Sequence, residues 1–167
     1  MIEMRHAVRA AFALAAMVLA PASIASEKVL AFETMAGVGR PYTGGSNPIR
    51  GLSGGGLPWI IRVGKGEVKA DGRIEVKVRG LVIADDPAVP PARRLTNPSA
   101  NFRVVVSCLT VDASGAAVTA NRSTGDFPAT PTGDADVEAA LDLPSPCIAP
   151  VVLVTSSTGA WFAATGG

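Results

Sequence analysis

The sequence predicts an all-β protein: a single antiparallel β-sandwich, or an open barrel, of about seven or eight strands, preceded by a cleavable signal helix. Three observations predict this fold class. Short apolar runs rich in Val, Ile and Phe recur along the chain, and such residues favour strands. Clusters of Gly, Pro, Ser and Asp separate these runs, as is typical of antiparallel sheets. Beyond residue 25, no segment has the period of an amphipathic helix.

The first 25 residues have the features of a secretory signal peptide. Arg5 and Arg9 form a positive n-region, Ala10 to Ala20 is an uninterrupted apolar run, and residues 23–25 offer a small-residue cleavage site. This run is shorter than the roughly 20 residues that span a bilayer, so we expect general secretory export and no integral membrane span. The alternative is a short helix that stays on the protein. We therefore divide the chain into a signal peptide, residues 1–25, and one β domain, residues 26–167.

The charge balance of the exported chain excludes two classes of partner. Glu3, Arg5, Arg9 and the single histidine, His6, leave with the signal peptide, so 13 basic and 13 acidic side chains remain. Neutralising nucleic-acid phosphates needs a basic surplus, and so does a polybasic membrane contact. We expect neither a nucleic acid nor a membrane surface as partner.

The two cysteines, Cys108 and Cys147, are predicted to form a disulfide. In an exported chain an even number of cysteines indicates paired thiols, and two cysteines allow one connectivity. The alternative, a reactive thiol, is not favoured, because there is no Cys-x-x-Cys spacing and the exported chain has no histidine to activate a thiol.

The strands follow from apolar runs and from alternation, and the loops from glycine and proline. Residues 37–58 are rich in Gly, Pro, Ser and Asn, and residues 85–98 contain four prolines. Proline cannot serve a central strand, so both segments are expected to be loops or crossings. We expect strands at residues 29–32, 59–63, 66–81 (a hairpin), 102–111, 116–120, 136–143, 151–155 and 160–164.

The hairpin is the clearest of these elements. Residues 66–81 alternate between apolar and charged side chains on both sides of Asp71-Gly72, which indicates one buried and one solvent-exposed face. A two-residue turn would pair Lys69 with Ile74 and place a charge on the apolar face. A three-residue turn, with its glycine in the left-handed region, pairs Val68 with Ile74 and is therefore expected.

The three-residue turn also determines which charged residues lie opposite each other on the solvent-exposed face of the hairpin. Residues directly opposite each other there carry like charges, which destabilise a sheet. Diagonal ion pairs would offset this repulsion. We therefore expect Glu67 to bind Arg73, and Lys69 to bind Glu75.

The stretch from Gly51 to Trp59 is the most unusual local sequence. Consecutive glycines let a ligand or another backbone approach closely, but this stretch lacks the residues of a P-loop or a dinucleotide fingerprint. We predict either a tight structural loop that delivers Trp59 to the core, or part of a ligand surface. Trp161 and Phe162 are adjacent on a predicted strand and should point to opposite faces, so one of them is a candidate exposed ring. The candidate ligand surface consists of Gly54, Gly55, Gly56, Trp59, Trp161 and Phe162.

Acidic side chains are the remaining chemical groups of interest. Two carboxylates can perform glycoside hydrolysis, and several oxygens can bind calcium. The candidates are Asp85 and Asp86, and the group of Asp126, Asp134, Asp136 and Glu138. A hydrolytic or calcium site would use Asp85, Asp86, Asp134 or Asp136. The spacing around Asp134 lacks the terminal glutamate of an EF-hand, so solvated turn and strand positions are the simpler interpretation.

Several segments resemble a family of small exported bacterial proteins of unknown function. The resemblance rests on Arg-Gly-x-x-Gly-Gly-Gly-Leu-Pro-Trp at residues 50–59, Ser-Cys-Leu at 107–109, Leu-Pro-x-Pro-Cys-x-Ala-Pro at 143–150, and Ala-Trp-Phe-Ala at 160–163. It covers most of the exported chain. It implies export, one β domain and paired cysteines, and it implies no catalytic activity.

Together these observations predict a secreted, non-enzymatic β protein with a binding or structural role at the cell surface or outside the cell. Without histidine, the exported chain cannot form a Ser-His or Cys-His dyad, and no cofactor is expected. Candidate partners are a carbohydrate, a small apolar ligand or another protein. The alternative is a carboxylate-dependent hydrolase or a calcium-binding module.

Overall fold

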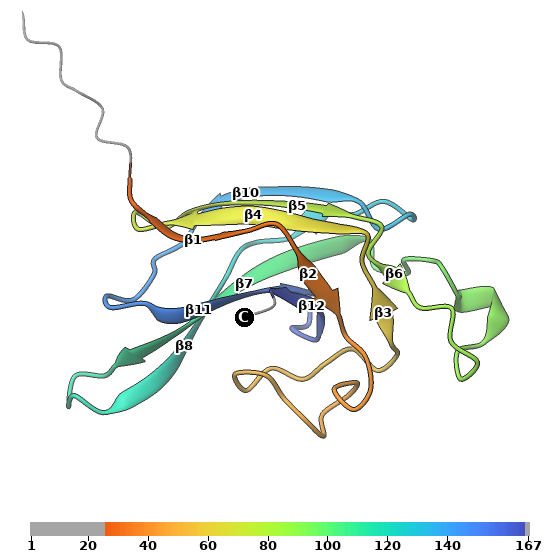
Figure 1. Ribbon diagram of the computed structural model, residues 1–167, viewed down its shortest axis with the longest axis horizontal. Helices are drawn as coiled ribbons and strands as arrows, with labels where there is room; N and C mark the ends of the chain where they lie inside the picture. The colour runs from red at the N-terminus through yellow and green to blue at the C-terminus, as the bar shows by residue number, and fades with distance from the viewer. Residues whose placement is uncertain (1–25, 166–167) are drawn as a thin grey trace, which may run out of the picture.

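The computed structural model describes residues 26–165, which form twelve β-strands and one short 3-10 helix (Figure 1). Eight of these strands have five or more residues, in agreement with the predicted number. The other four have only two or three residues each. The predicted signal peptide lies outside the described residues.

One antiparallel sheet has four strands, in the spatial order β1-β4-β5-β10. In its central hairpin, the inner face carries apolar residues or glycine and the outer face carries mostly charged residues, as the sequence pattern predicted. The bounds are β1 (Lys28–Phe32), β4 (Val63–Lys69), β5 (Arg73–Arg79) and β10 (Ala135–Ala140).

The second sheet has six strands, in the order β2-β12-β11-β7-β8, with β9 pairing with the start of β7. A two-stranded ribbon of β3 and β6 is separate from it. The bounds are β2 (Met35–Gly37), β3 (Trp59–Ile60), β6 (Val82–Ile83), β7 (Asn101–Val111), β8 (Ala117–Ser123), β9 (Phe127–Pro128), β11 (Ile148–Thr155) and β12 (Trp161–Thr165), with the 3-10 helix at Pro91–Arg93.

The two large sheets form two packed layers around one hydrophobic core (Figure 1). Val68 and Ile74 contribute from the four-stranded sheet, and Phe102, Val104 and Val106 contribute from the six-stranded sheet. All five side chains are buried. The fold is therefore a β-sandwich, and the predicted fold class is confirmed.

The β4–β5 hairpin has the predicted three-residue turn. Val68 lies opposite Ile74, and Gly72 has a φ of 83°, in the left-handed region. A Cβ atom at this position would lie 1.9 Å from the carbonyl oxygen of Leu141. Both the backbone conformation and the close approach of Leu141, the residue that follows β10, therefore require glycine.

One of the two predicted diagonal ion pairs forms, and the other does not. Lys69 lies 3.9 Å from the Glu75 carboxylate, as expected. Glu67, however, binds Lys28 at 2.6 Å and Lys69 at 2.8 Å rather than Arg73. The prediction considered the hairpin alone, whereas β1 pairs with β4 and supplies Lys28 from outside it.

The predicted disulfide is present between Cys108 of β7 and Cys147. It joins residues 39 positions apart and ties β7 to the segment that leads into β11. Cys108 is buried in the core. Disulfides persist in oxidising compartments, which fits the predicted export.

Candidate functional site

The glycine-rich segment of residues 38–58, which we call the glycine segment, folds back against the start of β12. The amide of Gly55 donates to the carbonyl of Trp161 at 2.8 Å, and the amide of Trp161 donates to the carbonyl of Ser53 at 3.0 Å. Gly54 forms an isolated parallel bridge with Trp161. The expected long loop is therefore present, and these bonds fix its three central residues to the sheet.

Aromatic rings from three distant parts of the chain meet beside this segment. The ring of Trp59 stacks on that of Phe162, with centroids 4.0 Å apart and planes 19° from parallel. Phe102 approaches Phe162 edge-on at 6.1 Å. Val38 holds this pair in register, because its amide donates to Phe162 and its carbonyl accepts from Trp59, both at 2.8 Å.

Neither tryptophan is an exposed ring. Trp59 is 5% exposed and Trp161 is 3% exposed, and Phe162 is buried as well. The expectation that one of the two rings, Trp161 or Phe162, is exposed is therefore wrong. It took one face of their strand to be open to solvent, whereas the glycine segment pairs with that strand at Trp161.

The three consecutive glycines have different roles. A Cβ atom at Gly54 would lie 2.0 Å from the carbonyl oxygen of Tyr42, and one at Gly55 would lie 3.0 Å from the Phe162 ring. At Gly56 nothing lies within 4 Å of the same position. The first two glycines therefore permit close packing of the glycine segment, and the third faces open space.

A cavity of about 440 Å³ opens beside the stacked rings, and we call it the Trp59 cavity. Its wall combines the end of the glycine segment, β3, β6, β12 and the loop between β6 and β7. Apolar side chains form most of this wall, and Arg93 and Ser99 supply its polar groups. The lining residues are Gly56, Leu57, Trp59, Ile83, Arg93, Pro98, Ser99 and Phe162.

Arg93 is the charged group of the Trp59 cavity. It is exposed and lies at the end of the 3-10 helix. Within residues 26–165 its guanidinium forms no ion pair. The neighbouring Arg94, by contrast, donates to the carbonyl of Val89 at 2.9 Å and pairs with Asp85. The guanidinium of Arg94 is therefore bound within the loop, and that of Arg93 is available to bind a ligand.

The structure brings the six predicted ligand-surface residues into one neighbourhood. Gly56, Trp59 and Phe162 line the Trp59 cavity, and Gly54, Gly55 and Trp161 join the glycine segment to β12 behind it. Sequence reasoning missed the wall formed by Ile83, Arg93 and Ser99. That wall belongs to a proline-rich crossing with no recognisable motif, so only its placement in the fold shows its proximity.

Asp134, just before β10, and Asp136, within it, both bind groups at the end of β5: Gly80 and Arg79. Asp136 binds the guanidinium of Arg79 through both carboxylate oxygens, at 2.8 and 2.9 Å. Asp134 accepts a hydrogen bond from the backbone amide of Gly80 at 2.8 Å. Both candidate calcium ligands therefore pin β10 to its neighbour in the sheet.

The acidic pair after β6 is engaged in a similar way. Asp86 binds Arg40 at 3.0 Å and accepts from the amide of Ala88 at 2.8 Å, while Asp85 pairs with Arg94 at 3.4 Å. Among residues 26–165, no group of three or more His, Cys, Asp or Glu side chains is placed to hold a metal ion. All four predicted calcium or hydrolytic residues therefore bind groups of the protein that hold the fold together.

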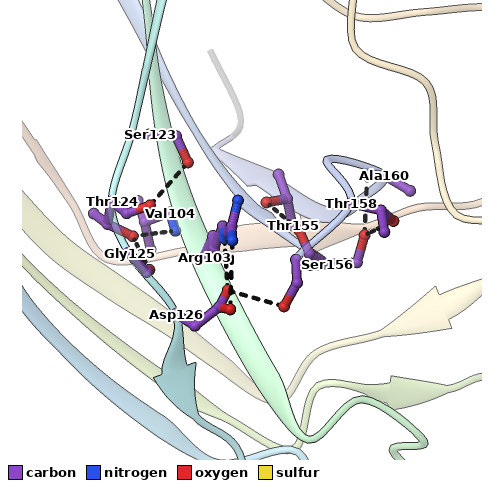
Figure 2. A network of polar contacts seen from close by, with 11 residues as sticks. Arg103, Val104, Ser123, Thr124, Gly125, Asp126, Thr155, Ser156, Thr158 and Ala160 are labelled. Carbon is purple, nitrogen blue, oxygen red and sulfur yellow. Dashed lines mark hydrogen bonds and ion pairs between the residues drawn. The ribbon is translucent and has the colours of Figure 1, made fainter.

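Figure 2 shows a polar network that ties the start of β7 to the turn between β11 and β12. Arg103 binds Asp126 at 2.5 Å, and the hydroxyl of Ser157 donates to the same carboxylate at 2.9 Å. Hydrogen bonds from Arg103 first, and then from Ser157, lower the pKa of Asp126. This carboxyl is therefore ionised at neutral pH and is a poor general acid, so the network serves to fix the turn.

A second hollow, of about 360 Å³, lies on the outer face of the four-stranded sheet. Glu67 lies opposite Glu75, and Glu75 lies opposite Glu138. Hydrogen bonds from Lys28 first, and then from Lys69, lower the pKa of Glu67 to about 2. The lining of this hollow is dominated by charged side chains and has no aromatic ring. Small-molecule sites are mostly apolar with a few polar groups, so the Trp59 cavity is the better candidate.

Comparisons with known proteins leave the chain without an assigned family: no family model, curated protein or solved structure matches it. The resemblance to small exported bacterial proteins therefore stays a prediction. Within residues 26–165 there is no helix of the length and apolar character needed to cross a membrane.

Proposed function

We propose that this chain is an exported, non-enzymatic binding protein that holds a small ligand in the Trp59 cavity. One observation carries the proposal: a cavity of about 440 Å³ is lined by five apolar side chains and by Arg93, which forms no ion pair within residues 26–165. Small-molecule sites typically enclose ~300–1,000 Å³ and combine apolar walls with a few placed polar groups. The Trp59 cavity has this composition.

The chemistry of the wall defines the class of ligand. Trp59 and Phe162 offer apolar ring surface, and Arg93 offers a guanidinium that suits a carboxylate or another planar anion. The hydroxyl of Ser99 can donate to the same group. The ligand is therefore a small molecule with an apolar, preferably aromatic, portion and one acidic group. A neutral sugar is less suited, because the two rings on the cavity wall, Trp59 and Phe162, are largely buried and stack on each other.

Export is part of the same proposal. The signal-peptide features of residues 1–25 and the disulfide between Cys108 and Cys147 both favour function outside the cytosol. The carboxylate-dependent alternative has less support, because Asp86 and Asp136 are each bound to an arginine.

The proposal is tested by ligand binding to the purified exported protein. Aromatic carboxylates, their neutral amides and a set of oligosaccharides are compared by thermal shift, and hits are titrated by tryptophan fluorescence. We expect stabilisation by the carboxylates, because only these satisfy both Arg93 and the apolar wall. Arg93→Gln should weaken binding about tenfold, the effect of losing roughly 1.4 kcal/mol.

Arg62→Gln is the matched control, because Arg62 is also exposed but does not line the cavity. It should bind like the wild type. Equal affinity for acids and amides, or an Arg93→Gln variant with unchanged affinity, would contradict the assignment of Arg93. The absence of any stabilising ligand of this class would contradict the proposed function itself.

A further inference from the structure

The four strands that end the two large sheets differ in how their free edges are protected. Unpaired edges invite pairing with another chain, and proteins block them with charges, bulges or short strands. β1 has a register shift between Lys28 and Leu30, β10 carries Asp136 and Glu138, and β2 has only three residues. Each of these edges has one of the usual protections.

β8 has no bulge and is not short, and it carries a single charged residue. It has seven residues and includes neither proline nor glycine, and it pairs with β7 from Ala117 to Ser123 without a register shift. Six of its residues are exposed, and Ala120 is half-buried. Its one ionisable residue, Arg122, is turned to the carbonyl of Asp142, to which its Nε donates at 2.9 Å. In Figure 1, β8 forms an outer rim of the sandwich.

Exposed apolar side chains accompany this edge. Leu109 lies opposite Thr119 on one side and opposite Ile148 on the other, so these three residues form a row across β8, β7 and β11. Leu109 is 40% exposed, Ile148 is 55% exposed, and Val111 is 51% exposed. Three of the seven exposed large hydrophobic residues described, Ile148, Leu109 and Val111, lie on this face, and Val118 of β8 lies on the opposite face of the sheet. Such clustering marks an interaction surface.

We propose that β8 pairs with β8 of a second copy of this chain, in antiparallel orientation about a two-fold axis. The second copy is the occupant that the strand itself favours, because an antiparallel pair of identical strands is self-complementary. Centring the axis on Thr119 places this residue opposite Thr119 of the second copy, and Val118 opposite its Ala120. No like charges then face each other across the new pair.

Two further features favour a second copy. The exported chain has 13 basic and 13 acidic side chains, so two copies do not repel each other through net charge. The exposed row of Ile148 and Leu109 ends at Thr119 on the edge strand. Pairing of the two β8 strands about the axis joins this row to the same row of the second copy. The six-stranded sheets of the two copies then form one continuous sheet.

The test is the oligomeric state of the purified protein, measured by light scattering coupled to size-exclusion chromatography. We expect the mass of a dimer for the wild type and of a monomer for Thr119→Lys, because a charge on an edge strand opposes pairing. Thr34→Lys is the matched control, since it makes the same change at an exposed position between β1 and β2. It should remain a dimer.

Hydrogen exchange of the wild type provides a second measurement that needs no variant. The outward-facing amides of β8 should become protected as protein concentration rises, while those of β10 should not. A wild type that is monomeric at every concentration would overturn the proposal. So would a folded Thr119→Lys variant that stays dimeric, or protection that appears on another edge.

Discussion

The two large sheets differ in how their outer faces are covered, although they share one core. In β5, buried Ile74, Val76 and Val78 alternate with charged residues that remain accessible to solvent. In β7, all five residues from Val104 to Cys108 are at most 5% exposed. One face of the four-stranded sheet is therefore open, whereas both faces of the six-stranded sheet are covered at its centre.

The glycine segment is responsible for this difference. Asn121 lies opposite Ser107, so the two side chains share a face, and Asn121 donates to the carbonyl of Arg50 at 3.1 Å. The guanidinium of Arg50 then reaches the carbonyl of Ala149 on β11 at 2.9 Å. A segment distant in sequence thus covers the outer face of the six-stranded sheet, and it ends at the Trp59 cavity. The site candidate lies where the fold depends most on long-range packing.

Removing the disulfide should have the largest effect, and it acts on the six-stranded side of the molecule. The double variant Cys108→Ala/Cys147→Ala should lose about 4 kcal/mol of unfolding free energy, because the closed loop no longer restricts the unfolded chain. Urea unfolding followed by circular dichroism measures this loss. A loss below about 1 kcal/mol would show that packing alone holds β7 to its neighbours.

Gly54→Ala should separate the glycine segment from the sheet. The added Cβ atom overlaps the carbonyl oxygen of Tyr42 at 2.0 Å, so we expect a loss near the upper end of about 1–3 kcal/mol. Gly56→Ala is the control, because nothing lies within 4 Å of its Cβ position. Thermal unfolding of both variants decides the comparison, and equal melting temperatures would refute the close approach at Gly54.

A pair of outer-face substitutions tests the difference between the sheets directly. Val105→Ala removes a buried side chain from the six-stranded sheet and should cost about 2 kcal/mol. Lys77→Ala changes an exposed outer-face position of the four-stranded sheet and should stay within about 0.5 kcal/mol of the wild type. Similar losses in urea unfolding for the two variants would mean that both outer faces are equally covered.

The smallest effect is expected on the open face of the four-stranded sheet, at Glu67. Hydrogen bonds from Lys28 and Lys69 lower its pKa from 4.5 to about 2. The ionised carboxylate therefore stabilises the fold above about pH 4.5, and this contribution is lost as the pH falls toward 2. Glu67→Gln should melt slightly below the wild type at neutral pH.

The difference in melting temperature between Glu67→Gln and the wild type should close on acidification. Glu138→Gln is the control, because within residues 26–165 Glu138 forms no ion pair. A difference that persists unchanged at low pH would show that Glu67 acts through packing rather than through its charge.

The parts of the structure that were predicted correctly depend on neighbours in sequence or on simple counting. The three-residue turn at Gly72 follows because only this turn length places the apolar residues Val68 and Ile74 opposite each other. The disulfide follows from the presence of two cysteines. The run of residues 59–63 was less well predicted: β3 ends at Ile60, and Val63 begins β4. Apolar character alone does not show where a chain leaves one sheet for another.

By itself, the sequence determined the β class, the hairpin with its turn, and the cysteine pair, because alternation and turn chemistry act between residues close along the chain. Only the tertiary structure decided that both tryptophans are buried and that Arg93 joins Trp59 on one cavity wall. It also decided that β1 supplies Lys28 as a second partner of Glu67, beside Lys69. These outcomes depend on which distant segments pack together, and the packing free energy that selects them has no local pattern in the sequence.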